Sequence, residues 1–101
     1  MSKIYIQGIY VLESKIEIAQ LLFQQNKFQE TIDICNKILA NDSNSIEAIK
    51  LIAKSFLAKR EIDDARLYFH KALNISPDDY EVIKDLGNAY QAVGDIGNAK
   101  K

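Results

Sequence analysis

The chain has 101 residues, of which 48% are hydrophobic and 27% are charged, a balance that suits a single globular domain. Thirteen basic and fourteen acidic residues leave a formal net charge of −1, which argues against nucleic acid or an anionic membrane as a partner. The apolar runs are too short to span a bilayer, and a single cysteine excludes an internal disulfide, so we expect a cytoplasmic protein.

Residues 1–11 are the least regular part of the chain. The stretch KIYIQ at residues 3–7 favours a strand by composition, whereas Gly8 would interrupt any helix that began there. We predict an N-terminal lead-in, either a helical turn or an extended segment, whose apolar side chains pack in part on the rest of the protein.

The clearest regular unit spans residues 46–79 and contains two apolar stripes. The first stripe consists of Ile49, Ile52, Ala53 and Phe56. After a polar break at residues 59–60, the second consists of Ile62, Ala65, Phe69, Ala72 and Leu73. Each spacing places the stripe on one face of a helix. Pro77 is expected to end the second helix, because proline cannot continue the hydrogen-bond ladder.

A weaker copy of this pattern precedes the central unit in residues 12–45. The copy is degenerate, because Thr31 and Cys35 stand where the central unit has an alanine and a phenylalanine. The break between its two helices is expected at residues 26–27, where asparagine tolerates the left-handed conformation that follows a helix end. Ser45 is expected to cap the next helix.

A second copy begins at residue 80 and reaches the end of the sequence. Leu86, Gly87 and Tyr90 hold the offsets of a first helix, and the two aspartates at residues 78–79 are expected to cap it. Gly94 marks the expected break, and Ala99 falls where the second helix would place an alanine. Residues 80–101 are therefore predicted to be a truncated third unit.

A helical hairpin of 34 residues with small and large residues at these offsets resembles the tetratricopeptide repeat (TPR) family. The resemblance covers about residues 12–101. It is best in the central unit, where Ile49 departs from the family's frequent tryptophan. It implies an all-α fold: a right-handed superhelical solenoid of antiparallel helix pairs with about two and a half repeats. In such a solenoid we expect Ala53 and Gly87 to face a neighbouring helix, with Phe69 and Tyr90 filling gaps between units.

The residues of the chain do not predict catalysis, a metal site or a cofactor. His70 is the single histidine and is expected at a helix surface. Cys35 is expected to be a buried, unreactive thiol, because burial without positive neighbours keeps it protonated. The acidic pairs at residues 63–64 and 78–79 lack the spacing of a calcium loop and suit the starts of helices. We therefore predict a protein that is not an enzyme.

The resemblance implies that the first helix of each unit lines a concave groove for a peptide or helix of another protein. Carried over by position, the groove of the second and third units contains Glu47, Lys50, Lys54, Glu81, Lys84, Asn88 and Gln91. The first unit would add Glu13, Glu17, Gln20 and Gln24. Lys50 and Lys54 share a helix face. Together with Lys84 they are expected either to form a basic stripe for an acidic ligand or to be merely solvated.

These expectations describe a non-catalytic protein–protein interaction module, with no nucleic-acid or membrane partner. Two alternatives use the same fold: a structural array that forms homo-oligomers through the C-terminal face, and a regulatory array within a larger protein. A clamp for the acidic C-terminus of heat-shock chaperones is disfavoured. Glu81 and Asp85 stand where that clamp has lysine and arginine, and two acids would repel a carboxylate.

Overall fold

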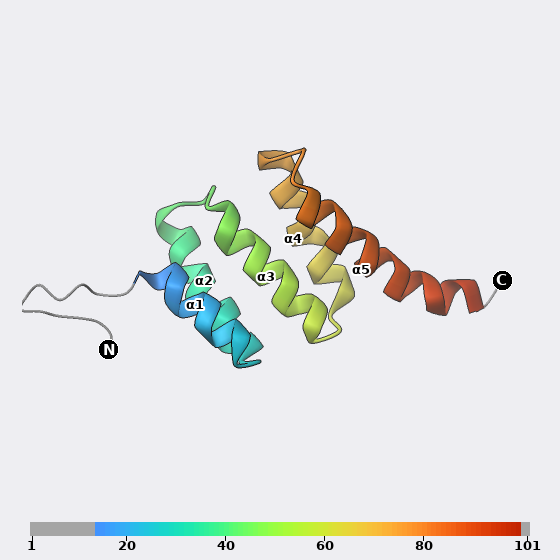
Figure 1. Ribbon diagram of the computed structural model, residues 1–101, viewed down its shortest axis with the longest axis horizontal. Helices are drawn as coiled ribbons and strands as arrows, with labels where there is room; N and C mark the ends of the chain where they lie inside the picture. Colours follow the sequence, from blue (N-terminus) through green and yellow to red (C-terminus); the bar gives the residue numbers. More distant parts are fainter. Residues whose placement is uncertain (1–13, 100–101) are drawn as a thin grey trace, which may run out of the picture.

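The computed structural model of the protein describes residues 14–99, with side chains to residue 92, so the lead-in predicted for residues 1–11 lies outside the described range. The described residues form five α-helices and no strand, which confirms the predicted all-α class. The helices are α1 (Lys15–Gln24), α2 (Phe28–Asn41), α3 (Ile46–Ala58), α4 (Ile62–Ile75) and α5 (Tyr80–Ala99). The first four form two antiparallel hairpins, and α5 packs beside the second hairpin (Figure 1).

Polar side chains fix where the helices begin. Before α1, the hydroxyl of Ser14 accepts a hydrogen bond from the backbone N–H of Glu17, and the Glu17 carboxylate accepts one from the N–H of Ser14. This reciprocal arrangement is a capping box. Ser45 and Asp79 precede α3 and α5, and each accepts a hydrogen bond from the backbone N–H three residues further on. Both of these caps agree with the prediction from the sequence.

Each helical hairpin turns at a residue with left-handed backbone geometry. Asn26 has φ 64° and Arg60 has φ 68°. In both turns the N–H of the next residue donates to a carbonyl five residues back, at 2.9 Å. This bond satisfies one of the carbonyls left open at the helix end. Asparagine was expected to adopt this conformation, whereas arginine does so less readily because it lacks the short polar side chain that can hydrogen-bond to the local backbone.

Helix α3 lies at the centre of the array and packs against each of the other four helices. One side of α3 contributes Ala48 and Ile52 to a core cluster that it shares with α1 and α2. The other side contributes Ile49 and Ala53 to a second cluster, which it shares with α4 and α5. The two clusters confirm that each hairpin buries its apolar stripe partly against the next one, as stacked repeats do.

Two expectations about the third unit are wrong. The helix break expected at Gly94 does not occur, because α5 runs without interruption from Tyr80 to Ala99. Gly87 does not face a neighbouring helix, because a Cβ atom built there would have nothing within 4 Å. The glycine keeps the offset of Ala53, which is fully buried, but among the described residues no helix covers it.

Candidate protein-interaction groove

The first helices of the three units form one layer of the molecule. The backbone of α3 lies close to those of α1 and α5, whereas the backbones of α2 and α4, which lie behind them, do not approach each other within the described residues. Helices that touch in one layer and separate in the other make an array that curves toward the touching layer. The concave side is therefore built from α1, α3 and α5, as the TPR resemblance implied.

A hollow of about 230 Å³ lies in this layer and draws its lining from all three helices. Its lining residues are Gln20, Glu47, Lys50, Leu51, Lys54 and Glu81. Five of these six were assigned to the groove from the sequence. Leu51 is the sixth, an apolar residue that was not among the positions assigned from the sequence. Lys84, Asn88 and Gln91 lie on α5 outside the hollow, and all three are exposed.

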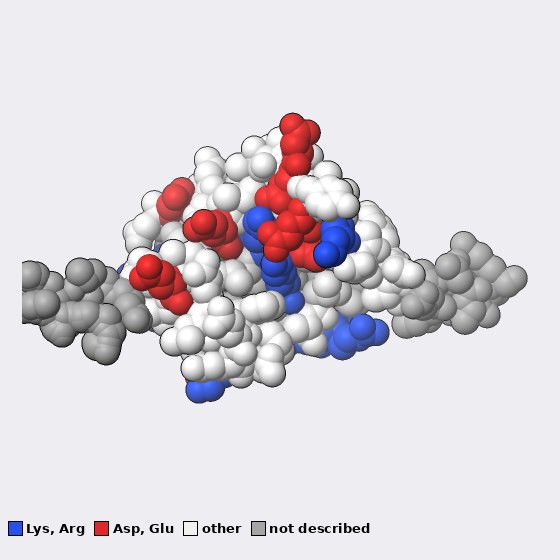
Figure 2. Space-filling view, in the orientation of Figure 1, with Lys and Arg blue, Asp and Glu red and all other residues white. Residues whose placement is uncertain are grey.

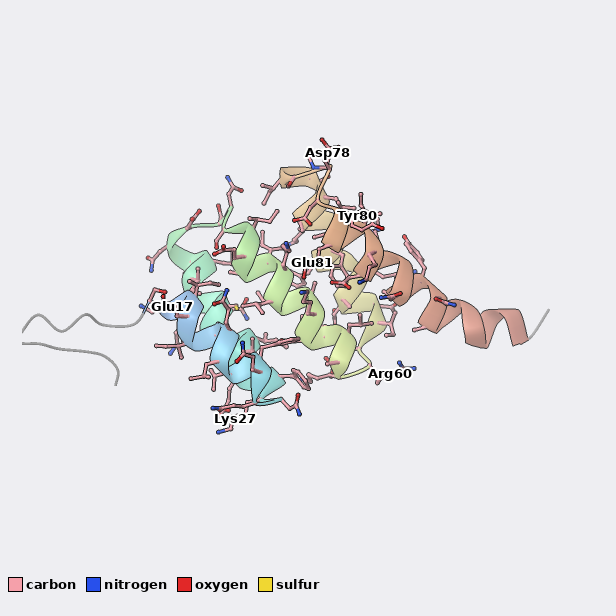
Figure 3. The ribbon with its side chains drawn as sticks, in the orientation of Figure 1. Glu17, Lys27, Arg60, Asp78, Tyr80 and Glu81 are labelled. Atoms are coloured by element: carbon pink, nitrogen blue, oxygen red, sulfur yellow. The ribbon has the colours of Figure 1, made fainter. Side chains whose placement is uncertain are left out.

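The two lysines of α3 form ion pairs with acidic side chains at the N-terminal cap and in the first turns of α5. Lys50 Nζ lies 2.9 Å from Asp79 Oδ2 and 2.9 Å from Glu81 Oε1. Lys54 forms an ion pair with Glu81 and lies 3.9 Å from a carboxylate oxygen of Asp85. Figure 2 shows blue side chains bordered by red ones over this region, and Figure 3 places Glu81 between α3 and α5.

This network shifts the pKa values of its members. Hydrogen bonding to Lys50 lowers the pKa of Asp79 below 3.8, and hydrogen bonding to Lys54 and then Lys50 lowers the pKa of Glu81 below 4.5. Burial alone would lower the pKa of Lys50, but its hydrogen bonds to Glu81 and Asp79 raise it above 10.5. Asp85 differs from the other carboxylates, because burial raises its pKa above 3.8.

The network changes the expected charge of the groove. Lys50 and Lys54 do not form an open basic stripe, because each is paired with acids of the third unit. Four acidic side chains, Glu47, Asp79, Glu81 and Asp85, border these two lysines, so the region carries an excess of negative charge. An acidic ligand would have to displace carboxylates that are already hydrogen-bonded.

The residues considered for chemistry lie apart from the groove. Cys35 is fully buried, and burial raises the pKa of its thiol to about 12, which is the unreactive state expected from the sequence. His70 is exposed on α4, where its Nε2 lies 3.1 Å from the hydroxyl oxygen of Tyr90. Within residues 14–92, no three histidine, cysteine or acidic side chains gather closely enough to hold a metal. No helix in the described range is long and apolar enough to cross a membrane.

The similarity of this chain to known proteins is found in solved structures and not in sequence families. The sequence matches no protein-family model, and no curated protein is significantly similar to it. Among solved structures it is similar to the first TPR domain of Spaghetti (RPAP3) bound to the HSP90 peptide SRMEEVD, with a TM-score of 0.77 and 20% identity. The chain therefore has a TPR-like fold. The match covers 79% of this chain and 64% of that domain.

A second solved structure gives the same result. The solution structure of the first TPR domain of human RPAP3 has a TM-score of 0.77 and 20% identity to this chain, with coverage of 83% of this chain and 66% of that domain. The TPR-like chain thus spans about two-thirds of the length of the TPR domains that it matches. The likeness confirms the resemblance in fold that the 34-residue period predicted.

Proposed function

We propose that this TPR-like chain is a non-catalytic protein-interaction module that binds a peptide or helix of a partner protein on the layer formed by α1, α3 and α5. The observation that carries the proposal is the hollow that these three helices share. Its lining combines a partly exposed apolar side chain, Leu51, with amide and charged groups of Gln20, Glu47 and Lys54. Such a mixture provides an apolar contact together with groups that orient a ligand. We also propose that the module acts in the cytoplasm.

The similar domain of Spaghetti binds an HSP90 peptide with an acidic end, but the residues here favour another ligand. Ile16, Gln20 and Leu51 replace the polar residues that a carboxylate clamp needs, and Glu81 and Asp85 place negative charge at its far side. We therefore propose a partner segment without a cluster of carboxylates. The groove assignment of Lys84, Asn88 and Gln91 remains part of this proposal.

The test is a selection of randomised peptides displayed on phage against the full chain. We expect peptides that bind the wild-type chain and lose binding to Gln20→Trp, because an indole at this exposed position on α1 would fill the hollow. The matched control is Asn36→Trp, which adds the same bulk at an exposed position on α2. The peptide SRMEEVD serves as a defined probe and is expected not to bind.

Two results would contradict the groove assignment. The first is that the selected peptides bind Gln20→Trp and the wild type with equal affinity, which would place their binding site outside the hollow. Tight binding of SRMEEVD that Gln20→Trp abolishes would show that the groove accepts a carboxylate-rich ligand despite Glu81 and Asp85. Circular dichroism of each variant shows whether the fold is retained.

Two alternative functions use the same fold: a homo-oligomer that forms through the exposed apolar residues of α5, and a regulatory array of a larger protein. Ile83 and Tyr90 are both 47% exposed, which is the observation that favours the homo-oligomer. Sedimentation of the full chain over a wide concentration range distinguishes a homo-oligomer from a monomeric binding module. A mass that rises with concentration supports self-association, and a constant monomer mass contradicts it.

A further inference from the structure

Helix α5 carries an apolar stripe that repeats a covered stripe of α3. The α5 stripe consists of Tyr80, Ile83, Gly87 and Tyr90. The positions 34 residues earlier are Ile46, Ile49, Ala53 and Phe56, and all four belong to the core that α3 forms with α4. The α3 stripe thus shows, within the same chain, how this pattern is covered when a helix packs on it.

The α5 stripe is exposed along its whole described length. Tyr80 is 77% exposed, and Ile83 and Tyr90 are each 47% exposed. The space beside Gly87 is open. In Figure 1, α5 lies at one edge of the array, and among the other described helices it contacts only α3 and α4. Three large apolar side chains in one row with open space between them form the kind of patch that a partner covers.

The covering helix of α3 indicates which kind of helix fits. Helix α4 presents Ala65, Phe69 and Ala72 to the shared core, and all three are fully buried. Small residues of α4 allow close approach to α3, and the phenylalanine fills the space between the helices. On α5, the residue at the offset of Ala53 is Gly87, so an incoming helix can approach at least as closely there.

Basic side chains border the stripe on both sides. The guanidinium carbon of Arg66, on α4, lies 5.1 Å from the centre of the Tyr90 ring. Arg66 also forms an ion pair with Asp63 at 2.9 Å. The Asp63 side chain is 89% exposed, so the pair is weak and an acidic group of a partner can compete for Arg66. On the other border, Lys84 is exposed and lies four residues from Tyr80 and three from Gly87, so it shares their side of the helix.

We propose that the α5 stripe is a second docking surface, distinct from the hollow of the groove and sharing only Lys84 with the groove residues, for an amphipathic helix of a partner protein. The partner helix carries a small residue that packs on Gly87, apolar residues that cover Ile83 and Tyr90, and acidic residues on its flanks that pair with Arg66 and Lys84. Charge complementarity selects this occupant over a second copy of the chain. Two copies joined through this stripe would bring Arg66 and Lys84 of both copies together, and these like charges would repel one another.

The tested probe is a display library of amphipathic helices. Their apolar stripe follows the spacing of Ala65, Phe69 and Ala72, while the central and flanking positions are randomised. Selection against the full chain is expected to enrich glycine, alanine or serine at the centre and acidic residues on the flanks. The Ile83→Asp variant is expected to bind the selected helices about tenfold more weakly or worse. Leu21→Asp is the matched control, because Leu21 is 49% exposed but lies on α1.

Three further measurements separate the proposal from its competitors. Combined Arg66→Glu and Lys84→Glu should change the selected flanks from acidic to basic, and flanks that stay acidic would contradict the proposal. Gln20→Trp should leave these helices bound, so failure of the groove and failure of the stripe are distinguishable. Gly87→Leu, which fills the open space, is a second blocking variant if Ile83→Asp does not fold.

Sedimentation of the wild-type chain decides between a partner helix and a second copy. The proposal expects a monomer that binds one selected helix per chain. A dimer that Ile83→Asp converts to monomer would make a second copy the occupant and overturn the assignment. Helices that bind the wild type and Ile83→Asp equally would also overturn it.

Discussion

Helices α3 and α5 hold equivalent places in consecutive units, yet only α3 is covered on both sides. Ile49 of α3 is 3% exposed, whereas Ile83, its counterpart 34 residues later, is 47% exposed. Ala53 is fully buried, whereas its counterpart Gly87 borders open space. The opposite side of α5 is buried, with Val82 at 1% exposure, Leu86 at 8% and Ala89 at 0%. Burial in a repeat array therefore depends on which neighbours are present and not on the offset alone.

The largest expected difference is between Ile49→Ala and Ile83→Ala. Truncating the buried Ile49 should cost about 2–5 kcal/mol of unfolding free energy, because a cavity forms between α3 and α4. Truncating the half-exposed Ile83 should cost about 1 kcal/mol or less, because little of the side chain is removed from water by folding. Urea unfolding followed by circular dichroism measures both. Equal costs would mean that the α5 stripe is covered in solution.

Adding side-chain atoms at Ala53 and at Gly87 is expected to change the stability in opposite directions. Ala53→Leu should destabilise by about 1–3 kcal/mol, because the extra carbons overpack a fully buried site. Gly87→Ala should stabilise by up to about 1 kcal/mol, because alanine is the better helix former and its Cβ meets nothing. Thermal melting of the two variants and the wild type measures both changes in stability. A destabilising Gly87→Ala would place another element against α5.

Much of the fold could be predicted, because its determinants repeat along the sequence. The 34-residue period fixed the helical hairpins, and the caps at Ser45 and Asp79 follow from local side-chain chemistry. The uncovered side of α5 could not be predicted, because Gly87 has the same offset as a buried alanine. The break expected at Gly94 also failed, since a glycine is tolerated within a helix at a modest cost.

The ion network of the groove is the part of the site that sequence reasoning missed. The lysines share one face of α3, but their acidic partners lie at the start of α5. Lys50 and Asp79 are 29 residues apart, and Lys54 and Glu81 are 27 apart. Charges slightly less than one period apart are brought together when consecutive units stack. Opposite charges at that separation were the available signal, and helix-face patterns alone do not contain it.

Removing the link between α3 and α5 should have a moderate effect that depends on pH. Lys50→Ala combined with Lys54→Ala should cost about 1 kcal/mol near neutral pH, because these partly exposed pairs are screened by water. The folded-state pKa values of Asp79 and Glu81 lie below 3.8 and 4.5, so their contribution is present above about pH 5. It is lost as the pH falls through these lowered values.

The double lysine variant should therefore lose less stability on acidification than the wild type. In both proteins Asp85 opposes the loss of stability on acidification, because its raised pKa means that protonation relieves the cost of burying its charge. Lys37→Ala, at an exposed position on α2, is the control. Urea unfolding at a series of pH values checks the prediction. Parallel stability curves for the wild type and the double variant would show that the ion pairs do not persist in solution.

The smallest expected effect is that of Tyr90→Phe, which removes only the contact between the Tyr90 hydroxyl and His70 Nε2 at 3.1 Å. Because Tyr90 is half-exposed, water replaces the lost partner, and the cost should be about 0.5 kcal/mol or less. The counterpart of Tyr90 in α3 is Phe56, whose ring lies 5.7 Å from that of Tyr68 and packs on the α3–α4 core. A cost for Tyr90→Phe well above 1 kcal/mol would mean that the hydroxyl is buried in solution, and that α5 is covered on the same side as α3.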